Sequence, residues 1–374
     1  MMSFKRWRLF ATLMVVIAMV AAACSSGGDS EGSEPAETTT TAAASEPAEV
    51  LKIAFVHVGP VADKGWSWAH DQGRQYVEAQ LGDAVEITTL ESIPEGSDAQ
   101  RVFEDLAAAG NKLIFGTSFG YMDPMLAAAE NFPDVAFMHA TGFKTSENMG
   151  NYFGAAEEGR YLSGMAAGAA TETNLIGYVA AFPIPEVLRG INAFTLGARE
   201  VNPDVEVQVV WTSTWFDPPK EGTAAESLLD AGADVIAMHQ DSAAPGQAAE
   251  AAGAKWVGYN TDMTEFAPTA WLTAAIWDWG PFYLAQAKAV MDGTWKAESV
   301  YGNMADGMVA LAPFGESVDK ALQETILERE DEIKAGTFSV FPDPIVDQDG
   351  NERELGDIFT MDFFVKGVIG SPTG

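Results

Sequence analysis

The chain has 374 residues, of which 47% are hydrophobic and 20% are charged, and its formal net charge is −33 at pH 7. A surface with this much negative charge repels nucleic acid and anionic lipid. We therefore expect no nucleic-acid partner. The only cysteine is Cys24, so no internal disulfide can form.

The first 23 residues have the pattern of a bacterial secretory signal. Lys5, Arg6 and Arg8 precede an apolar run at 9–23, which is short for a transmembrane helix. Small residues lead up to Cys24 in a pattern that resembles a lipobox, where the cysteine takes a lipid; an incidental cysteine is the alternative. We therefore expect cleavage before Cys24, lipidation of Cys24, and an extracytoplasmic protein anchored to the outer face of the cell membrane.

Residues 24–49 contain the cysteine and then only small, polar and acidic side chains. Such a segment cannot bury enough apolar surface to offset its conformational entropy, which predicts a disordered acidic tether. The remaining stretch, 50–374, is long enough for two lobes.

Strand-like and helix-like patterns alternate after residue 50. In the first half, strands are predicted at 51–58, 84–90, 112–117, 135–140 and 149–155. A helix is predicted to open at Trp66, and further helices are predicted at 97–109, 123–131 and 157–171. In the second half, strands are predicted at 175–181, 205–212, 235–239, 255–259 and 271–276, and helices at 187–201, 220–231, 246–252, 280–291 and 318–334. This alternation is typical of an α/β fold with parallel sheets. We assign 50–170, with a return segment at about 292–374, to lobe 1 and 171–291 to lobe 2.

Aromatic side chains follow several of the predicted strands. Trp66 and Trp68 follow the first strand, and the others are Phe119, Tyr121, Trp215, Phe216, Trp277 and Trp279. Parallel strands deliver the loops after them to one edge of the sheet, where α/β proteins bind ligands. Each aromatic group alone is also compatible with ordinary core packing.

Aspartates lie among these aromatic residues. They are Asp63, Asp123, Asp217, Asp241, Asp262 and Asp278. Carboxylates accept hydrogen bonds from ring N–H groups or hydroxyls while aromatic rings stack on a flat ligand, so a purine or a sugar fits the set. The alternative for Asp63, Asp123 and Asp217 is a helix N-cap.

The sequence contains no dinucleotide fingerprint, phosphate-binding loop or nucleophile elbow, which argues against an enzyme. His57, His139 and His239 follow or end predicted strands and would have to converge to bind zinc. Single histidines on separate strands are more often hydrogen-bonded contacts or core groups. We therefore expect no metal and no cofactor.

Several stretches in order resemble the basic membrane protein (BMP) family of substrate-binding lipoproteins of ABC transporters. The matching stretches include 57–73 (HVGPVADKGWSWAHDQG), 110–124, 157–164, 214–221, 258–263 and 361–370. The resemblance implies the type I periplasmic-binding-protein fold, two Rossmann-like lobes joined by a hinge. It also implies a purine nucleoside or base as ligand and an ABC permease as partner.

The first turn departs from the family pattern. His57 stands where the family has an aspartate, and Ser67 stands where it has a base-reading asparagine, whereas Asp262 fits the family's acid in lobe 2. The family's ribose-binding lysine has no match; the segment 277–279, with Asp278, occupies that region. These departures favour a free base such as adenine over a nucleoside.

The resulting hypothesis is a monomeric solute-binding lipoprotein that closes on a purine. Trp66 and either Trp215 or Phe216 would sandwich the ring, Asp241 and Asp262 would accept hydrogen bonds from its edge, and Glu157 would contribute near the crossover. The alternatives are a sugar receptor of the same fold, a receptor that signals without transport, and a zinc-dependent hydrolase.

Overall fold

The computed structural model describes residues 50–374, which belong to one compact unit, 48–374. The predicted signal, the lipidated Cys24 and the acidic tether lie outside the described residues. Within residues 50–374, no helix combines the length and the apolar character needed to cross a membrane.

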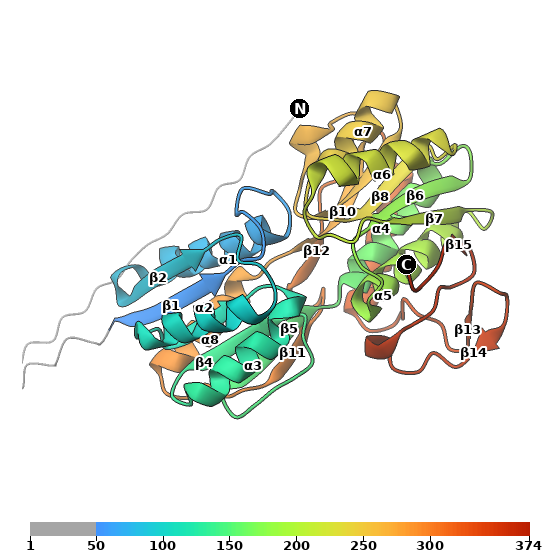
Figure 1. The fold of residues 1–374 in the computed structure, drawn as a ribbon. Coiled ribbons are helices and arrows are strands. Elements are labelled where there is room, and N and C mark those ends of the chain that lie inside the picture. Colours follow the sequence, from blue (N-terminus) through green and yellow to red (C-terminus); the bar gives the residue numbers. More distant parts are fainter. Residues whose placement is uncertain (1–49) are drawn as a thin grey trace, which may run out of the picture. The chain divides into compact units, whose positions relative to one another are not determined.

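The first lobe is built on a sheet of six parallel strands. Their bounds are β1 (Leu51–Val56), β2 (Val85–Leu90), β3 (Leu113–Gly116), β4 (Ala136–Ala140), β5 (Met149–Gly154) and β11 (Ser299–Gly302). The spatial order is β11-β5-β4-β3-β1-β2 (Figure 1). Four helices cover this sheet, namely α1 (Trp66–Leu81), α2 (Ser97–Ala108), α3 (Met122–Asn131) and α8 (Gly280–Met291).

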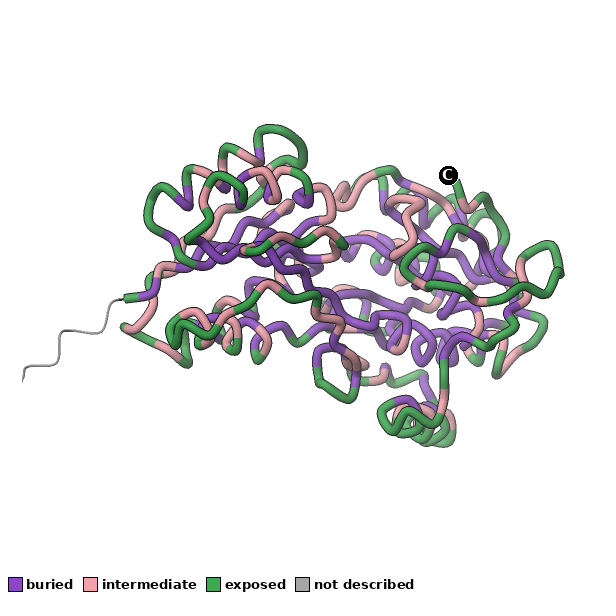
Figure 2. The backbone as a smooth tube through the Cα atoms, turned by 90° about the horizontal axis from the view of Figure 1, so that it is seen from below, coloured by how far each residue is buried: buried purple, intermediate pink, exposed green. Residues whose placement is uncertain are grey.

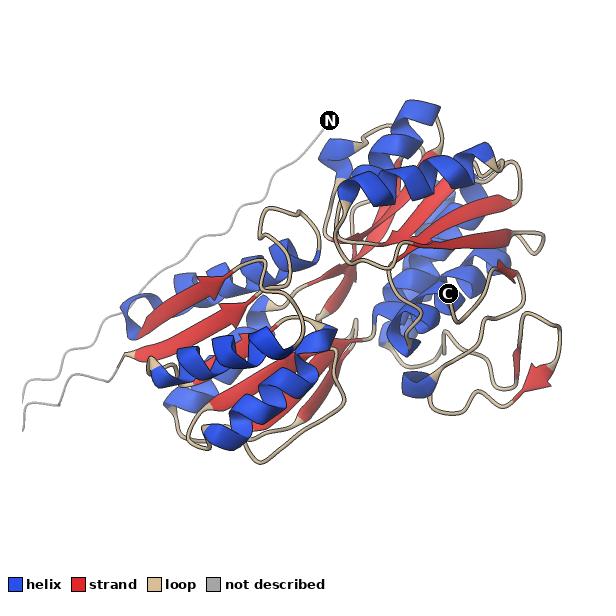
Figure 3. Cartoon of the chain, in the orientation of Figure 1, coloured by secondary structure: helices blue, strands red, loops and turns tan. Residues whose placement is uncertain are grey.

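Both faces of the first sheet are buried, which explains why its strands read as continuous apolar runs. Ile53 and Phe55 of β1 contribute to one hydrophobic cluster, and Ala54 and Val56 point to the other face and contribute to a second. Helices α1 and α8 pack together, as do α2 and α3. Helices therefore lie on both sides of the strands, as Figure 3 shows.

The second lobe is built on a sheet of seven strands. Their bounds are β6 (Leu175–Ala180), β7 (Glu206–Trp211), β8 (Val235–His239), β9 (Lys255–Asn260), β10 (Trp271–Trp277), β12 (Val309–Leu311) and β15 (Val368–Ile369). The order is β12-β10-β9-β8-β6-β7-β15, with only β12 antiparallel to its neighbour. The helices are α4 (Ala156–Ala170), α5 (Pro185–Val201), α6 (Pro218–Asp230), α7 (Ala244–Ala252) and α9 (Lys320–Lys334).

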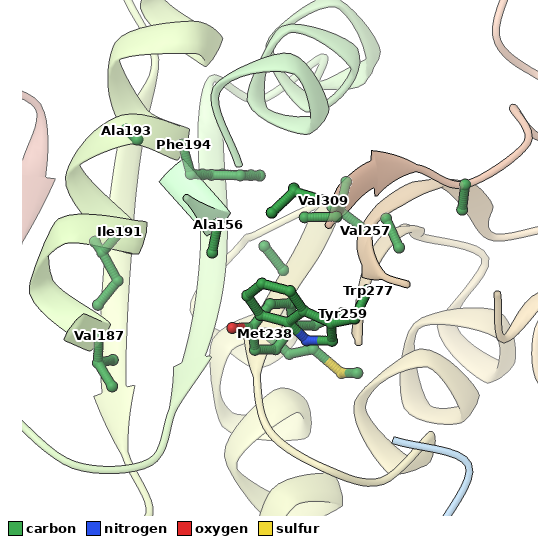
Figure 4. Close-up of a cluster of buried hydrophobic side chains, with 14 of the residues drawn as sticks. Ala156, Val187, Ile191, Ala193, Phe194, Met238, Val257, Tyr259, Trp277 and Val309 are labelled. Carbon is green, nitrogen blue, oxygen red and sulfur yellow. The ribbon is translucent and has the colours of Figure 1, made fainter. Parts of the chain in front are cut away.

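The second lobe repeats the strand order of the first. In both sheets the second strand lies outside the first, which is followed by the third, fourth and fifth. Part of the second core appears in Figure 4, where Val187, Ile191 and Phe194 project from α5 and Trp277 lies beside Tyr259. The buried parts of the chain in Figure 2 run along the strands of both lobes, whereas the exposed parts are outer helical turns and loops.

Small residues allow α4 and α5 to pack at very short range. A Cβ atom on Gly164 would lie 2.1 Å from the Phe194 carbonyl oxygen, and one on Gly197 would lie 1.9 Å from that of Tyr161. The backbones of α4 and α5 are therefore almost in contact.

The lobe boundaries differ from the expected 50–170, 171–291 and 292–374. Helix α4 packs on α5 and β10 in the second lobe, and α8 packs on α1 and β1 in the first. Of the return segment only β11 joins the first sheet, because β12 and β15 pair with strands of the second. The remaining short elements are the pair β13 (Ile345–Val346) and β14 (Glu352–Arg353), and the 3-10 turns η1 (Gly82–Ala84), η2 (Phe119–Tyr121), η3 (Thr264–Phe266) and η4 (Ile358–Thr360).

Candidate functional site

The strand order creates a switch point in each sheet. β1 lies between β2 and β3, and β6 lies between β7 and β8, so the chain leaves neighbouring strands in opposite directions there. Ligands of α/β proteins bind at the carboxyl ends of strands at such points. A narrow cavity at this point is lined by residues from both lobes. They are Val58, Trp66, Ser118, Phe119, Thr141, Glu186, Trp215, His239, Asp241 and Tyr259.

Trp66 is held in place by the start of α1. The Asp63 carboxylate accepts hydrogen bonds from the backbone N–H groups of Gly65 (2.8 Å), Ser67 (2.9 Å) and Trp68 (2.9 Å), which fixes the turn. The indole N–H of Trp66 donates to the Thr117 carbonyl oxygen at 2.6 Å. Because its polar atom is satisfied by the protein, Trp66 presents an apolar ring to the cavity.

The opposite lobe also contributes aromatic rings. Trp215 follows β7 and lies 5.0 Å from the ring of Phe182, measured between centroids. Tyr259 of β9 lines the cavity, and the guanidinium carbon of Arg160 lies 3.4 Å from the centroid of its ring. Trp66 and Phe119 from the first lobe therefore share the cavity with Trp215 and Tyr259 from the second.

Two acids of the second lobe line the cavity. Asp241 follows β8, and its Oδ1 accepts a hydrogen bond from Asn260 Nδ2 at 3.1 Å. Burial raises the pKa of Asp241 well above its usual value, and the nearby Asp63 and Glu221 raise it further. Glu186 lies in the first turn of α5, where burial raises its pKa to about 7, and its Oε1 lies 3.7 Å from His239 Nε2.

Three cavity-lining side chains have a buried polar atom without a partner. These atoms are Thr141 Oγ1, His239 Nδ1 and the Tyr259 hydroxyl oxygen. Buried polar groups are nearly always hydrogen-bonded, so all three are candidates for contacts to a ligand. Burial lowers the pKa of His239 well below its usual value, so the ring is neutral near pH 7.

The two lobes touch directly beside this cavity. Gly65 packs against the backbone of Asp241, and a Cβ atom on Gly65 would lie 2.2 Å from the Asp241 carbonyl oxygen. The Thr261 hydroxyl donates to the Lys64 carbonyl oxygen, and Lys64 Nζ lies 3.6 Å from Glu265 Oε1. The structure is therefore that of a closed arrangement of the lobes.

Comparison with known families decides what this architecture is. A model of the family described as "Bmp: ABC transporter substrate-binding protein PnrA-like" matches residues 50–341. The chain belongs to this Bmp family. It is therefore a substrate-binding protein of the ABC-transporter type and not an enzyme, and the resemblance seen in the sequence is confirmed.

The Bmp assignment is supported by individual relatives. A purine-binding protein of Brucella abortus is 47% identical over 334 residues, covering 87% of this chain and 95% of the relative. A protein of Haloferax volcanii named as a putative ABC transporter glucose-binding protein is 44% identical over 322 residues, covering 86% of this chain and 81% of the relative.

A solved structure matches the fold. A solute-binding protein of an ABC transporter system from Aeropyrum pernix K1 superimposes with a TM-score of 0.68 at 17% identity, covering 77% of this chain and 92% of that chain. The expected type I periplasmic-binding-protein fold is confirmed. Proteins of the Bmp family are extracytoplasmic and hand small-molecule ligands to a permease.

The structure brings four of the predicted site residues to the cavity, namely Trp66, Phe119, Trp215 and Asp241. Phe216, the alternative to Trp215 in the predicted sandwich, is not among the residues that line it. Asp217 caps α6 by accepting a hydrogen bond from Lys220 N–H at 3.2 Å, so the N-cap alternative holds for this residue.

His57, Ser67 and Tyr121 lie in the interior of the first lobe and not at the cavity. His57 Nδ1 lies 3.1 Å from Thr117 Oγ1, and burial lowers the pKa of this histidine to about 4. Ser67 is fully buried in the first turn of α1. The Tyr121 hydroxyl donates to the Ile93 carbonyl oxygen, and its ring packs edge-on against Phe103.

Three predicted acids are also engaged elsewhere. Asp262 is exposed and accepts a hydrogen bond from Thr264 N–H at 3.0 Å, and Asp278 is exposed and accepts one from Gly280 N–H at 3.3 Å. Asp262 follows β9 and Asp278 follows β10. Both strands lie farther from the switch-point strand β6 than β8 does. Glu157 forms a buried ion pair with Arg189, 3.2 Å from Nε, and is not a cavity residue.

The zinc alternative is not supported by the described residues. Within 50–374, no group of three or more histidine, cysteine or acidic side chains could hold a metal ion. His57 and His139 belong to the first lobe and His239 to the second. His139 Nε2 lies 2.8 Å from the Ser118 carbonyl oxygen, and burial lowers its pKa to about 4, as expected for a neutral core histidine.

Sequence reasoning missed Glu186. Its position could have identified it. Glu186 lies in the first turn of the helix that follows β6, the strand at the switch point. An acidic residue at a helix N-terminus can be a ligand contact, or it can simply interact favourably with the helix dipole. Only the strand order distinguishes these roles.

The substitution Asp241→Asn is expected to stabilise the ligand-free protein by an amount that increases with pH. An aspartate whose folded-state pKa is raised contributes stability while protonated and loses it as pH rises from about 4 through the raised value. The asparagine oxygen can still accept from Asn260. Urea unfolding between pH 4 and pH 8 should show a difference that grows by about 1.4 kcal/mol per pH unit at most. The exposed Asp278→Asn is the control, and a difference independent of pH would contradict the expectation.

Proposed function

We propose that this Bmp protein captures a purine between its two lobes and presents it to an ABC permease, with a free base such as adenine favoured over a nucleoside. The observation that supports this proposal most is the cavity itself. It combines aromatic rings from both lobes with the carboxyl groups of Asp241 and Glu186.

A purine would use both kinds of group. Its faces would stack on Trp66 from the first lobe and on Trp215 from the second, and only the closed protein offers both rings. Its N–H groups would donate to Asp241 and Glu186, and its ring nitrogens would accept from hydroxyl groups such as Thr141 Oγ1. The purine-binding relative from Brucella abortus favours the same ligand class.

The preference for a free base depends on the first turn. His57 and Ser67 have neither the carboxylate nor the amide that the family pattern places at these positions. Both side chains are also buried in the lobe. Asp262, which fits the family's acid, is exposed and occupied by Thr264. A ribose would therefore find fewer partners than the base.

A sugar is the second candidate, because a 44% identical relative is named for glucose. Sugars also stack their C–H faces on tryptophan and donate hydroxyls to carboxylates. They differ from purines in having a puckered ring without a π-system and an edge of hydroxyl groups, so a ligand screen separates the two.

A thermal-shift screen with adenine, guanine, adenosine and glucose tests the proposed function. A ligand that binds only the folded protein stabilises it by mass action and so raises its melting temperature. At a free ligand concentration of 100 times the Kd, the stabilisation is about 2.7 kcal/mol. The largest shift is expected for a free purine base. A shift with glucose and none with any purine would overturn the proposal.

Trp215→Ala is expected to weaken purine binding by about 1–3 kcal/mol, the range measured for base–aromatic stacking, or about 5- to 150-fold in Kd. Calorimetric titration with adenine measures this change. The matched control is Trp211→Ala, because Trp211 is a half-buried tryptophan of the same lobe that hydrogen-bonds to Ser371 and does not line the cavity. Equal losses in the two variants would show that Trp215 is not a ligand contact.

We further propose that Cys24 carries a lipid that anchors a monomeric protein to the membrane. Cys24→Ser should then move the protein from the membrane fraction to the soluble extracytoplasmic fraction. Retention of the variant on the membrane would contradict the anchor.

A further inference from the structure

A second cavity adjoins the first on the side of β5 and α5. It has a volume of about 340 Å³ and shares Phe119, Thr141 and Glu186 with the first cavity. The shared residues make the two cavities neighbours. A ligand in the first cavity would have to pass these three side chains to reach the second.

The second cavity is lined mostly by apolar groups. Aromatic rings around it include Phe143, Phe153, Tyr301 and Phe359. Phe143 is 71% exposed and Phe359 is 50% exposed, so part of this lining is apolar surface open to solvent. The Phe359 ring stands edge-on to Tyr301 with centroids 4.8 Å apart, so the lining is an ordered aromatic surface.

The charges around the second cavity argue against an anionic occupant. Arg189 lines it, but its Nε lies 3.2 Å from Glu157, and the Tyr301 hydroxyl donates to the same carboxylate at 2.8 Å. Glu186 adds a further acid at the junction with the first cavity. A phosphate or carboxylate would meet a guanidinium that is already paired, and among the described residues no second basic side chain lines this cavity.

The walls come from both lobes and from the C-terminal segment. Phe143 follows β4 and Phe153 belongs to β5 in the first lobe, whereas Glu186 and Arg189 belong to α5 in the second. Phe359 lies in η4, which packs against α5. An occupant of the second cavity would thus contact both lobes and favour closure in the same way as the ring in the first.

We propose that the second cavity binds an apolar substituent on the purine, attached through its exocyclic nitrogen. This inference rests on the proposed function, because the ring must occupy the first cavity. A secondary exocyclic amine keeps one N–H group, which Glu186 can accept at the junction, while the substituent passes on to the aromatic lining. The favoured ligands are then purines with a benzyl or branched-alkenyl amine.

Calorimetric titration with adenine and with 6-benzylaminopurine tests this inference on the full-length protein and two variants. Burying an aromatic substituent removes apolar surface from water, so the wild-type protein should bind 6-benzylaminopurine at least about 10-fold more tightly than adenine. Ser299→Trp places a large ring at an exposed position that lines only the second cavity, so it should abolish this preference and leave adenine affinity within about two-fold. Phe359→Ala should reduce the preference without filling the cavity.

The outcomes separate the two proposals. Adenine binding with no gain for 6-benzylaminopurine, or a gain that survives in both variants, overturns the second cavity as a subsite and leaves the proposed function standing. No binding of either purine overturns the proposed function and this inference with it.

Discussion

Arg189→Met is expected to lower the free energy of unfolding by about 3–5 kcal/mol, the range for removing one partner of a buried ion pair. Arg189 and Glu157 are 3% and 4% exposed, and Arg189 Nε lies 3.2 Å from Glu157 Oε2. Without the guanidinium, the Glu157 carboxylate keeps only the Tyr301 hydroxyl as a partner among the described side chains. Urea unfolding monitored by circular dichroism measures the loss.

The control for Arg189→Met is Lys220→Met. Lys220 forms an ion pair with Asp217 at 3.8 Å, but both side chains are largely exposed, at 58% and 39%. Exposed pairs contribute about 0–1 kcal/mol, so this variant should remain close to the wild type. If both variants lose the same small amount, Glu157 is not a structural ion-pair residue, and its predicted role as a ligand contact becomes the better interpretation.

Gly65→Ala is expected to weaken ligand binding by about 3 kcal/mol, or roughly 150-fold, while leaving each lobe folded. The added Cβ would lie 2.2 Å from the carbonyl oxygen and 2.8 Å from the Cα of Asp241, and backbone atoms cannot rotate away as a side chain can. The cost is at the upper end of the range for overpacking because the contact joins the two lobes. The lobes would have to separate, and only the closed state brings Trp66 and Trp215 together.

The control for Gly65→Ala is Gly222→Ala in α6, where the nearest atom to an added Cβ is the Ala244 Cβ at 3.8 Å. This is ordinary contact, so binding should be unchanged. Calorimetry with the ligand found in the screen measures affinity, and small-angle scattering reports closure. Wild-type affinity in Gly65→Ala would show that the lobes need not approach this closely to hold the ligand.

The alternation of strands and helices could be predicted from the sequence because buried parallel strands are continuous apolar runs. The position of Trp66 at a carboxyl edge followed from the same pattern. The lobe boundaries could not, because α4 and α8 pack on the lobe opposite to the strand that precedes each of them.

The candidate site was only partly predictable because strand order decides which loops meet. Asp241 follows β8 and Asp262 follows β9. Of these two strands, β8 lies next to the switch-point strand β6 and β9 does not. Tyr121 follows the same strand as Phe119, yet its hydroxyl turns to Ile93 in the core. Such choices depend on contacts between distant segments, which the spacing of residues in the chain does not reveal.

The most direct test of the central claim is a crystal structure of the protein grown with adenine. We predict a planar ring between Trp66 and Trp215, with an Asp241 carboxylate oxygen within hydrogen-bonding distance of a ring or exocyclic N–H group. A purine bound elsewhere, or an interlobe cavity that stays empty at saturating adenine, would contradict the account.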